Sequence, residues 1–367
     1  MLLLKTERDR LLRPLQAVSG IVDKRHTLPI LSNVLLERSD GRLTLLATDI
    51  ELQIQTVAEQ TEASEPVALT VSARKFQDIL RALPDGEVTL QTEEKRLLIR
   101  SGKSRFTLQT LPAADYPRMS ASTEVSVTVS LAQRHLRRLI GLVQYAMALQ
   151  DIRYYLNGML MVVSAGELRL VATDGHRLAY AAMPLPGVSE EIEIILPRKA
   201  VVELARLLAD NDDPVQLRLG TTQAQFNFGS IEFITKLIDG KFPDYERVIP
   251  VGHERVFSLA RTTLQAALQR AAILTNERFR GVRMVLSAGT LKLVSSNAEQ
   301  EEAEELLDVD YHWEPMDIGF NVNYLIDMLS NVAVETVEVS LKDSGSSALF
   351  SFPGQDDFKY VVMPMRI

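Results

Sequence analysis

The chain has 367 residues, of which 46% are hydrophobic and 24% are charged, and its formal net charge is −8. This length allows two or three globular domains, and the absence of cysteine excludes disulfide bridges and thiolate zinc sites. We expect a cytoplasmic protein without a membrane partner, because the apolar start MLLLK is too short for a signal peptide and no stretch has the apolar length of a membrane span.

A nine-residue pattern recurs three times and predicts a turn, a strand and a second turn. The copies are 41–49, 166–174 and 289–297. In each, glycine comes first, leucine recurs at alternate positions, and Asp or Asn stands eight places after the glycine. This pattern is typical of a half-buried strand that ends in an Asx turn. Because a short apolar strand precedes each copy, at 33–36, 158–163 and 281–286, the sequence predicts three similar β-hairpins.

Six amphipathic runs predict helices at about half this spacing. We expect them at residues 7–22, 72–83, 130–149, 197–209, 258–275 and 321–331. Each run begins at or beside a residue that favours a helix start, namely Thr6, Ser72, Ser130, Pro197, Ser258 and Asn321. Short alternating strands such as 87–91 and 215–219 fill the intervals. We therefore predict an α+β fold of six helix-plus-sheet half-repeats, paired into three repeated domains at 1–121, 129–250 and 254–367.

The predicted helices are basic although the chain as a whole is acidic. They contain fourteen Lys or Arg residues and five Asp or Glu residues, and the run 321–331 departs from the pattern because it carries no Lys or Arg. A basic helical layer on an acidic body is what a protein that faces a polyanion needs. The alternative is that helices favour Lys and Arg by propensity and that these side chains are merely solvated.

The segment Thr173-Asp-Gly-His-Arg177 is the candidate for catalysis. Asp174 and His176 are residue types that could form part of a site for general acid–base catalysis. However, Asp174 fills the turn position that Asp49 and Asn297 fill in the other copies, so turn geometry accounts for it. No nucleophile accompanies the cluster, and the five histidines show no metal-ligand spacing. We therefore expect no enzymatic activity, no metal and no cofactor.

Several segments together carry a family resemblance. They are His26–Leu31, Asp151–Gly158, Thr173–Leu178, Phe279–Gly281 and Tyr360–Ile367, within three repeated domains. Over its whole length the chain resembles the beta subunit of DNA polymerase III, the bacterial sliding clamp family. The resemblance implies a head-to-tail homodimeric ring of two three-domain protomers, with helices on the inner face and sheets outside. Such a ring encircles duplex DNA and tethers the replicative polymerase, which confers processivity.

The resemblance also implies a DNA-facing surface and a dimer interface. The DNA-facing positions are Arg25, Arg74, Gln150, Tyr154, Tyr155, Arg198 and Lys199. Contacts to phosphates hold DNA without reading its sequence, so we expect weak, salt-dependent binding to linear duplex. The interface positions are Ile273 and Leu274 as an apolar centre, and Arg96, Lys103 and Arg105 opposite Glu299, Glu301, Glu302, Glu304 and Glu305. The alternative is that these charged residues form solvated edges.

Finally, the resemblance implies a cleft that binds short linear peptides of the clamp loader, of replicative and translesion polymerases, and of repair proteins. The matching positions are Leu156, Thr173, Gly175, His176, Arg177, Leu178, Pro243, Arg247, Val248, Val361, Met363, Pro364, Met365 and Arg366, with Arg153, Asn321, Tyr324 and Ser347 at its rim. Apolar walls supply affinity, and a methionine-rich surface can serve many partners. Two alternatives stay open: an enzyme built on the 173–177 cluster, and a scaffold protein without a nucleic-acid partner, which leaves the basic helices unexplained.

Overall fold

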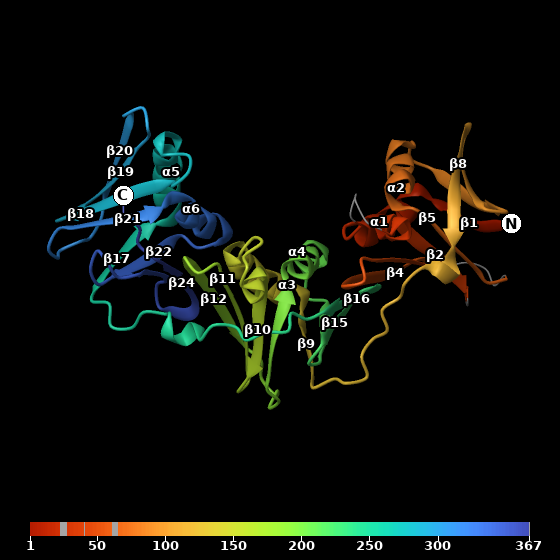
Figure 1. The fold of residues 1–367 in the computed structure, drawn as a ribbon, viewed down its shortest axis with the longest axis horizontal. Helices are drawn as coiled ribbons and strands as arrows, with labels where there is room; N and C mark the ends of the chain where they lie inside the picture. The colour runs from red at the N-terminus through yellow and green to blue at the C-terminus, as the bar shows by residue number, and fades with distance from the viewer. Residues whose placement is uncertain (23–27, 40, 61–64, 367) are drawn as a thin grey trace. The chain divides into compact units, whose positions relative to one another are not determined.

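The computed structural model describes residues 1–22, 28–39, 41–60 and 65–366. The chain divides into two compact units, and each combines segments that are distant in the sequence. Unit 1 consists of Met1–Arg137 and Val202–Leu237, and unit 2 consists of Arg138–Val201 and Ile238–Ile367. The elements of both are labelled in Figure 1.

Unit 1 is built on a twelve-stranded antiparallel sheet. In sheet order the strands are β1 (Leu2–Glu7), β6 (Glu87–Glu93), β7 (Arg96–Ser101), β8 (Ser104–Pro112), β5 (Val67–Ser72), β2 (Asn33–Ser39), β3 (Arg42–Thr48), β4 (Leu52–Gln60), β16 (Ile231–Lys236), β15 (Gln223–Phe228), β14 (Pro214–Leu219) and β9 (Val127–Ala132). The pairing of β4 with β16, in which Leu52 lies opposite Thr235, joins the N-terminal part of the sheet to the strands near residue 230.

Unit 2 contains an eight-stranded and a four-stranded antiparallel sheet. The larger sheet runs β13 (Ile192–Pro197), β10 (Gly158–Ser164), β11 (Glu167–Thr173), β12 (Arg177–Pro184), β24 (Gln355–Val362), β23 (Ala348–Phe352), β22 (Thr336–Leu341) and β17 (Arg255–Ala260). The smaller runs β20 (Glu302–Asp308), β19 (Thr290–Ser296), β18 (Gly281–Ser287) and β21 (Met316–Asn321). The pairing of β12 with β24, in which Arg177 lies opposite Val362, joins the 158–184 strands to the last strand of the chain.

Among the described residues, six α-helices accompany these sheets, and four of them pack in pairs. The α-helices are α1 (Arg8–Ser19), α2 (Ala73–Ala82), α3 (Gln133–Val143), α4 (Arg198–Leu207), α5 (Arg261–Ala271) and α6 (Val322–Asn331). Short 3-10 turns are η1 (Pro29–Ser32), η2 (Ala113–Asp115), η3 (Gln144–Ala146), η4 (Tyr154–Asn157), η5 (Tyr245–Arg247) and η6 (Ala272–Leu274). Helix α1 packs against α2 in unit 1, and α5 packs against α6 in unit 2 (Figure 1). Helix α1 faces β3 and β4 and buries Leu11, Leu15 and Val18, which share one helical face. No helix in the described part of the chain is long and apolar enough to span a membrane.

The hairpins predicted from the repeats are confirmed, because β2–β3, β10–β11 and β18–β19 are antiparallel pairs. Two predicted helix starts are also confirmed, since the side chains of Ser72 and Asn321 cap α2 and α6 by accepting backbone hydrogen bonds from Lys75 and Asn323.

The other four predicted helix starts lie in strands. Thr6 and Pro197 stand at the ends of β1 and β13, two residues and one residue before α1 and α4 begin. The error is larger at Ser130 and Ser258. Ser130 lies within β9 and Ser258 within β17, and the helices that follow begin three residues later, at Gln133 and Arg261. Both strands run directly into their helices. Each serine is an exposed residue between two buried ones, so the polar position of an alternating strand resembled a helix cap.

Candidate functional site

The segment 173–178 forms a tight turn between β11 and β12, as predicted. One carboxylate oxygen of Asp174 accepts hydrogen bonds from the backbone amides of His176 and Arg177, at 2.9 and 3.0 Å. The hydroxyl of Thr173 donates to the carbonyl oxygen of Arg177 at 2.6 Å and accepts from the amide of Gly175 at 3.1 Å. Gly175 has a positive φ of 87°, which favours glycine. Turn formation therefore accounts for Thr173 and Asp174 without catalysis.

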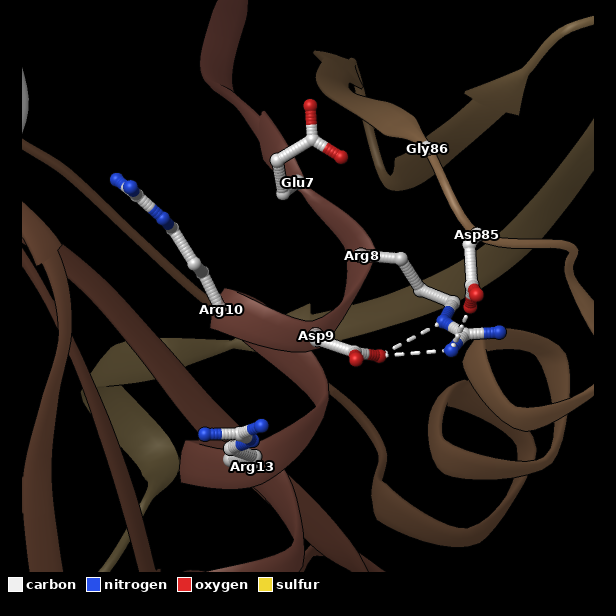
Figure 2. Close-up of a pocket in the computed structure, with 7 residues that line it drawn as sticks. All are labelled: Glu7, Arg8, Asp9, Arg10, Arg13, Asp85 and Gly86. Carbon is white, nitrogen blue, oxygen red and sulfur yellow. Dashed lines mark hydrogen bonds and ion pairs between the residues drawn. The ribbon is translucent and has the colours of Figure 1, made fainter.

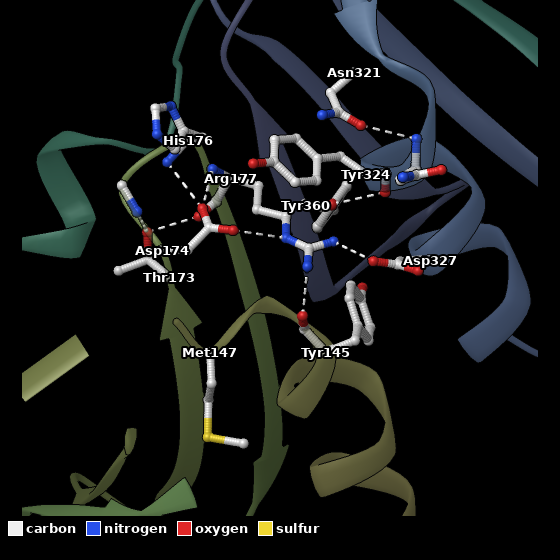
Figure 3. Close-up of polar contacts among 12 residues, drawn as sticks. Tyr145, Met147, Thr173, Asp174, His176, Arg177, Asn321, Tyr324, Asp327 and Tyr360 are labelled. Atoms are coloured by element: carbon white, nitrogen blue, oxygen red, sulfur yellow. Dashed lines mark hydrogen bonds and ion pairs between the residues drawn. The ribbon is translucent and has the colours of Figure 1, made fainter. Parts of the chain in front are cut away.

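The side chain of Arg177 turns inward and binds three separate elements of unit 2 (Figure 3). Its guanidinium donates to a carboxylate oxygen of Asp174 at 3.1 Å, to a carboxylate oxygen of Asp327 on α6 at 2.6 Å, and to the carbonyl oxygen of Tyr145 in η3 at 2.6 Å. The ring of Tyr324 lies 4.5 Å from the guanidinium carbon, close enough for a cation–π contact. With 9% of its side chain exposed, Arg177 stabilises this corner of unit 2 from within.

The surroundings of Arg177 favour its charged form. Burial alone would lower the pKa of Arg177, but Tyr360, Asp327 and Asp174 around it raise the pKa above its ordinary value. Burial raises the pKa of Tyr145, Tyr324 and Tyr360, so these phenols stay protonated across the physiological range. The cluster therefore places one cation among phenols that are neutral at physiological pH.

Sequence reasoning missed Tyr145, Asp327 and Tyr360 as members of this cluster. The hydroxyl of Tyr360 donates to the carbonyl oxygen of Tyr324 at 2.8 Å, and Asp327 lies 150 residues from its partner Arg177. One sequence signal was available: the helical run 321–331 carries an acidic residue and no basic one. The contact with Arg177 accounts for the acidic residue of that helix.

The end of the chain lies against this turn. Strand β24 pairs with β12, and beyond it the amide of Met363 donates to the carbonyl oxygen of His176 at 2.9 Å. The amide of Met365 donates to the carbonyl oxygen of Gly319 at 2.8 Å. Beneath them, Leu178 and Val361 belong to one buried apolar cluster. Residues up to Met365 are therefore held by backbone hydrogen bonds, although the side chain of Met363 is 50% exposed.

All eighteen positions predicted for the peptide cleft lie in unit 2. Those buried in the structure are Leu156, Thr173, Arg177, Leu178 and Val361. Those exposed are Arg153, Gly175, His176, Pro243, Arg247, Val248, Met363 and Arg366, and Asn321, Tyr324, Ser347, Pro364 and Met365 are half-buried. Of these positions, the exposed and half-buried ones are accessible to solvent and the five buried ones are not.

Contacts connect most of these positions to the turn. Arg153 approaches the carbonyl oxygen of Asp174 at 3.4 Å, and its guanidinium lies where a side chain at Gly175 would point. The same guanidinium holds Asp151 by hydrogen bonds that lower the pKa of that carboxyl to about 2. Phe242 and Tyr245, which flank Pro243, pack in the apolar cluster with Leu178. The structure thus brings Arg153, Met363 and the segment around Pro243 close to the 173–178 turn in unit 2.

The predicted DNA-facing residues are divided between the units. Arg25 lies outside the described residues. Arg74, in unit 1, is 72% exposed beside Asp78 and lines a cavity of about 510 Å³ between α1 and α2. The remaining five positions, Gln150, Tyr154, Tyr155, Arg198 and Lys199, belong to unit 2.

The rings of Tyr154 and Tyr155 contact each other edge to face, with centroids 5.8 Å apart. Gln150 is exposed and has a positive φ of 55°. Arg198 donates to the carbonyl oxygen of Met147 at 3.1 Å, and burial together with the charge of Arg177 lowers its pKa. Arg198 is therefore anchored in the same corner of unit 2 as the turn.

Helix α1 adds further basic side chains that line a cavity of about 410 Å³ in unit 1. Arg8 forms ion pairs with Asp9 and Asp85. Figure 2 shows Arg10 and Arg13 pointing away from this cluster. The positive charge predicted for the first helical run is therefore divided: Arg8 is held within the fold, and the next two arginines extend from the helix.

The predicted dimer-interface residues lie at exposed places in both units. Arg96, Lys103 and Arg105, on or beside β7 and β8, are exposed. Ile273 in η6 is 76% exposed and Leu274 is half-buried.

The acidic members lie on or just before β20, which is the edge strand of the four-stranded sheet. They are Glu299, Glu301, Glu302, Glu304 and Glu305. Glu304 and Glu305 form ion pairs with Lys292 and Arg270.

Comparison with known proteins identifies the family. Three domain models of the DNA polymerase III beta subunit match the chain in succession: the N-terminal domain at residues 2–120, the central domain at 130–244 and the C-terminal domain at 246–366. The chain belongs to the DNA polymerase III beta-subunit family. Members of this family are non-catalytic subunits, so the expectation of no enzymatic activity agrees with the family.

Named relatives and solved structures agree. The beta sliding clamp of Pseudomonas putida is 48% identical over 98% of this chain and 99% of its own length, and that of Escherichia coli is 47% identical with the same coverage. The crystal structure of a Pseudomonas aeruginosa sliding clamp bound to griselimycin covers 100% of both chains at 47% identity, with a TM-score of 0.95. A Caulobacter crescentus beta sliding clamp is 37% identical, with a TM-score of 0.92. The predicted fold class, with three clamp domains of mixed helix and sheet, is confirmed.

Proposed function

We propose that this protein is a DNA sliding clamp: a head-to-tail homodimeric ring, with three domains at 1–121, 129–250 and 254–367 in each protomer, that encircles duplex DNA in the cytoplasm. The observation that carries the proposal is the match of all three beta-subunit domain models, in order, along the chain. A closed ring needs a heterologous interface that closes after two subunits. The oppositely charged edges at residues 96–105 and 299–305, with Ile273 and Leu274 as their apolar centre, fit that need.

The basic helices support sequence-independent binding of DNA. Arginines such as Arg10, Arg13 and Arg74 can neutralise phosphates without contacting bases. Enclosure by the ring, rather than affinity, then retains the clamp on DNA, so it can slide with a polymerase that it tethers.

Binding to a short linear duplex is expected to be weak and to fall by roughly a hundredfold between about 50 and 200 mM salt, because counterions are released from the phosphates. Arg74→Ala should lower the slope of log affinity against log salt by about one, since it removes one phosphate contact. Fluorescence anisotropy of a labelled duplex measures both. Arg283→Ala, which removes an exposed arginine outside the predicted DNA-facing set, is the matched control. Affinity that does not change with salt would contradict the electrostatic account.

We further propose that partner proteins dock through linear peptides on unit 2, beside the 173–178 turn and the chain end. The crystal structure of the Pseudomonas aeruginosa clamp with griselimycin supports a ligand site on a close structural relative. The apolar cluster beneath the turn and the half-exposed Met363 provide an anchor, and the exposed arginines provide polar contacts that fix direction.

Met363→Ala and Arg366→Ala are each expected to weaken binding of a partner's clamp-binding peptide by tenfold or more. The first removes an apolar wall and the second removes an exposed cation. Isothermal titration of the intact protein with a peptide from its own polymerase measures the effect. Val251→Ala, at a 90% exposed valine outside the predicted cleft, serves as the control. Undiminished binding by both variants would place the peptide site elsewhere.

A further inference from the structure

Unit 1 contains a cavity of about 310 Å³ at the place where β4 meets β16. It is lined by Thr48, Ile50, Pro117, Arg118, Met119, Ser120, Gln223 and Lys236. None of these residues is used by the predicted DNA-facing surface, the dimer interface or the peptide cleft.

The turn that borders this cavity has the same hydrogen bonds as the 173–178 turn. The hydroxyl of Thr48 donates to the carbonyl oxygen of Leu52 at 2.9 Å and accepts from the amide of Ile50 at 3.0 Å. A carboxylate oxygen of Asp49 accepts from the amides of Glu51 and Leu52 at 3.0 and 2.8 Å. In this pattern Ile50 corresponds to Gly175. Both residues have a positive φ, and that of Ile50 is 72°.

The neighbouring strand also matches. In unit 1 the amide of Lys236, which ends β16, donates to the carbonyl oxygen of Glu51 at 2.9 Å. In unit 2 the amide of Met363, just after β24, donates to the carbonyl oxygen of His176 at 2.9 Å. Lys236 therefore occupies in unit 1 the position that Met363 occupies in the predicted peptide cleft.

A third wall corresponds by sequence. The segment 115–119, Asp-Tyr-Pro-Arg-Met, aligns with 244–248, Asp-Tyr-Glu-Arg-Val, and the tyrosine of each is buried. Arg118 and Met119 thus correspond to Arg247 and Val248 of the predicted cleft. Met119 is held in place by Gln53, whose side-chain amide exchanges two hydrogen bonds with its backbone at 3.0 and 2.8 Å.

The lining indicates the chemistry of an occupant. Ile50, Pro117 and Met119 are apolar, and the charged residues of the wall, Arg118 and Lys236, are both basic. Each basic side chain pairs with a glutamate, at 3.1 and 3.0 Å, but both remain nearly half exposed. Exposed ion pairs contribute little stability, so an incoming carboxylate can replace the glutamates at low cost.

We propose that unit 1 carries a second linear-peptide pocket, which takes a short extended segment with apolar side chains beside a carboxylate. The inference rests on the proposed function, because the comparison is with the predicted cleft of unit 2. The volume of the unit 1 cavity is at the lower end for ligand pockets, so the cavity fits two or three residues rather than a long peptide. Each protomer would then offer a partner two related peptide sites, the predicted cleft in unit 2 and the pocket in unit 1, which differ in charge because Lys236 stands where the cleft has Met363.

The test uses the absence of cysteine from the chain. Ser120→Cys places a unique thiol on an exposed wall residue of the pocket, and an environment-sensitive fluorophore is attached there. Titration with the peptide Ac-Leu-Asp-Leu-NH₂ is expected to give a saturable change. Met119→Glu and Lys236→Glu should each weaken binding at least tenfold, and Ac-Leu-Asn-Leu-NH₂ should bind several-fold more weakly. Lys236→Glu alters a half-exposed side chain, so it keeps the test sound if Met119→Glu disturbs the fold.

A second label separates this pocket from the predicted cleft. Ser347→Cys carries the same fluorophore at the cleft rim, and Met363→Ala should weaken only the response at that label. A response at Ser120→Cys that is lost in the two unit 1 variants supports the pocket, even if the cleft label stays silent and the proposed cleft fails. No saturable response at Ser120→Cys, or one that both unit 1 variants leave unchanged, overturns the inference.

Discussion

Replacing Arg177 with alanine is expected to lower the free energy of unfolding of unit 2 by about 2–4 kcal/mol. The substitution removes the donor for Asp174, Asp327 and the carbonyl oxygen of Tyr145 together. Removing one partner of a buried ion pair costs about 3–5 kcal/mol. The expected loss extends below that range because the side chain of Asp327 is 43% exposed and water can solvate it. Arg177→Lys keeps the charge but not the fork of donors, so its loss should be smaller.

The chain's single tryptophan makes this loss measurable in unit 2 alone. Trp313 lies in unit 2 with its ring 5.4 Å from Tyr311, so its fluorescence during a urea titration follows the unfolding of that unit. The matched control is Arg283→Ala, which removes an arginine that is 46% exposed and pairs with Asp317. That control should change stability by less than about 0.5 kcal/mol. Equal losses of unfolding free energy in Arg177→Ala and Arg283→Ala would show that the Arg177 cluster does not stabilise unit 2 more than an exposed ion pair does.

Replacing Ile273 and Leu274 together with alanine is expected to convert the dimer into monomers. Ile273 is 76% exposed in unit 2, which makes it an apolar side chain available to a partner protomer. A few apolar residues at the centre of an interface carry most of its affinity, and losing about 4 kcal/mol there weakens association roughly a thousandfold. Sedimentation velocity at micromolar concentration measures the change. Val251→Ala, at a 90% exposed valine, should leave the dimer intact. A double variant that still sediments as a dimer at low concentration would refute this interface.

Local patterns in the sequence predicted the repeated elements well. The hairpins and the turns at Asp49 and Asp174 follow from alternation and from the hydrogen-bonding capacity of an Asx residue, both of which act within a few residues. The same local reasoning failed at Ser130 and Ser258, because a serine on the exposed face of a strand resembles a helix cap until the strand pairing is known.

The contacts that build the candidate site could be predicted only in part. The family resemblance named the residues around the 173–178 turn, and the structure brings most of them together in unit 2. The resemblance gave no sign that Arg177 is buried, because the partners of Arg177, Tyr145 and Asp327, come from distant parts of the sequence. The correspondence between the unit 1 cavity and the predicted cleft likewise needed hydrogen bonds, since Ile50 and Gly175 have no chemistry in common.

The measurement that tests the central claim most directly is retention on circular DNA. The protein is loaded by its clamp loader onto a nicked circular plasmid, separated from free protein by gel filtration in high salt, and compared with a sample cut once by a restriction enzyme after loading. A ring held by enclosure predicts that the protein stays with the nicked circle, leaves the linearised plasmid by sliding off its ends, and is not retained in the Ile273→Ala, Leu274→Ala variant. Equal retention on circular and linearised DNA, or none on either, would contradict the proposal that this protein is a sliding clamp.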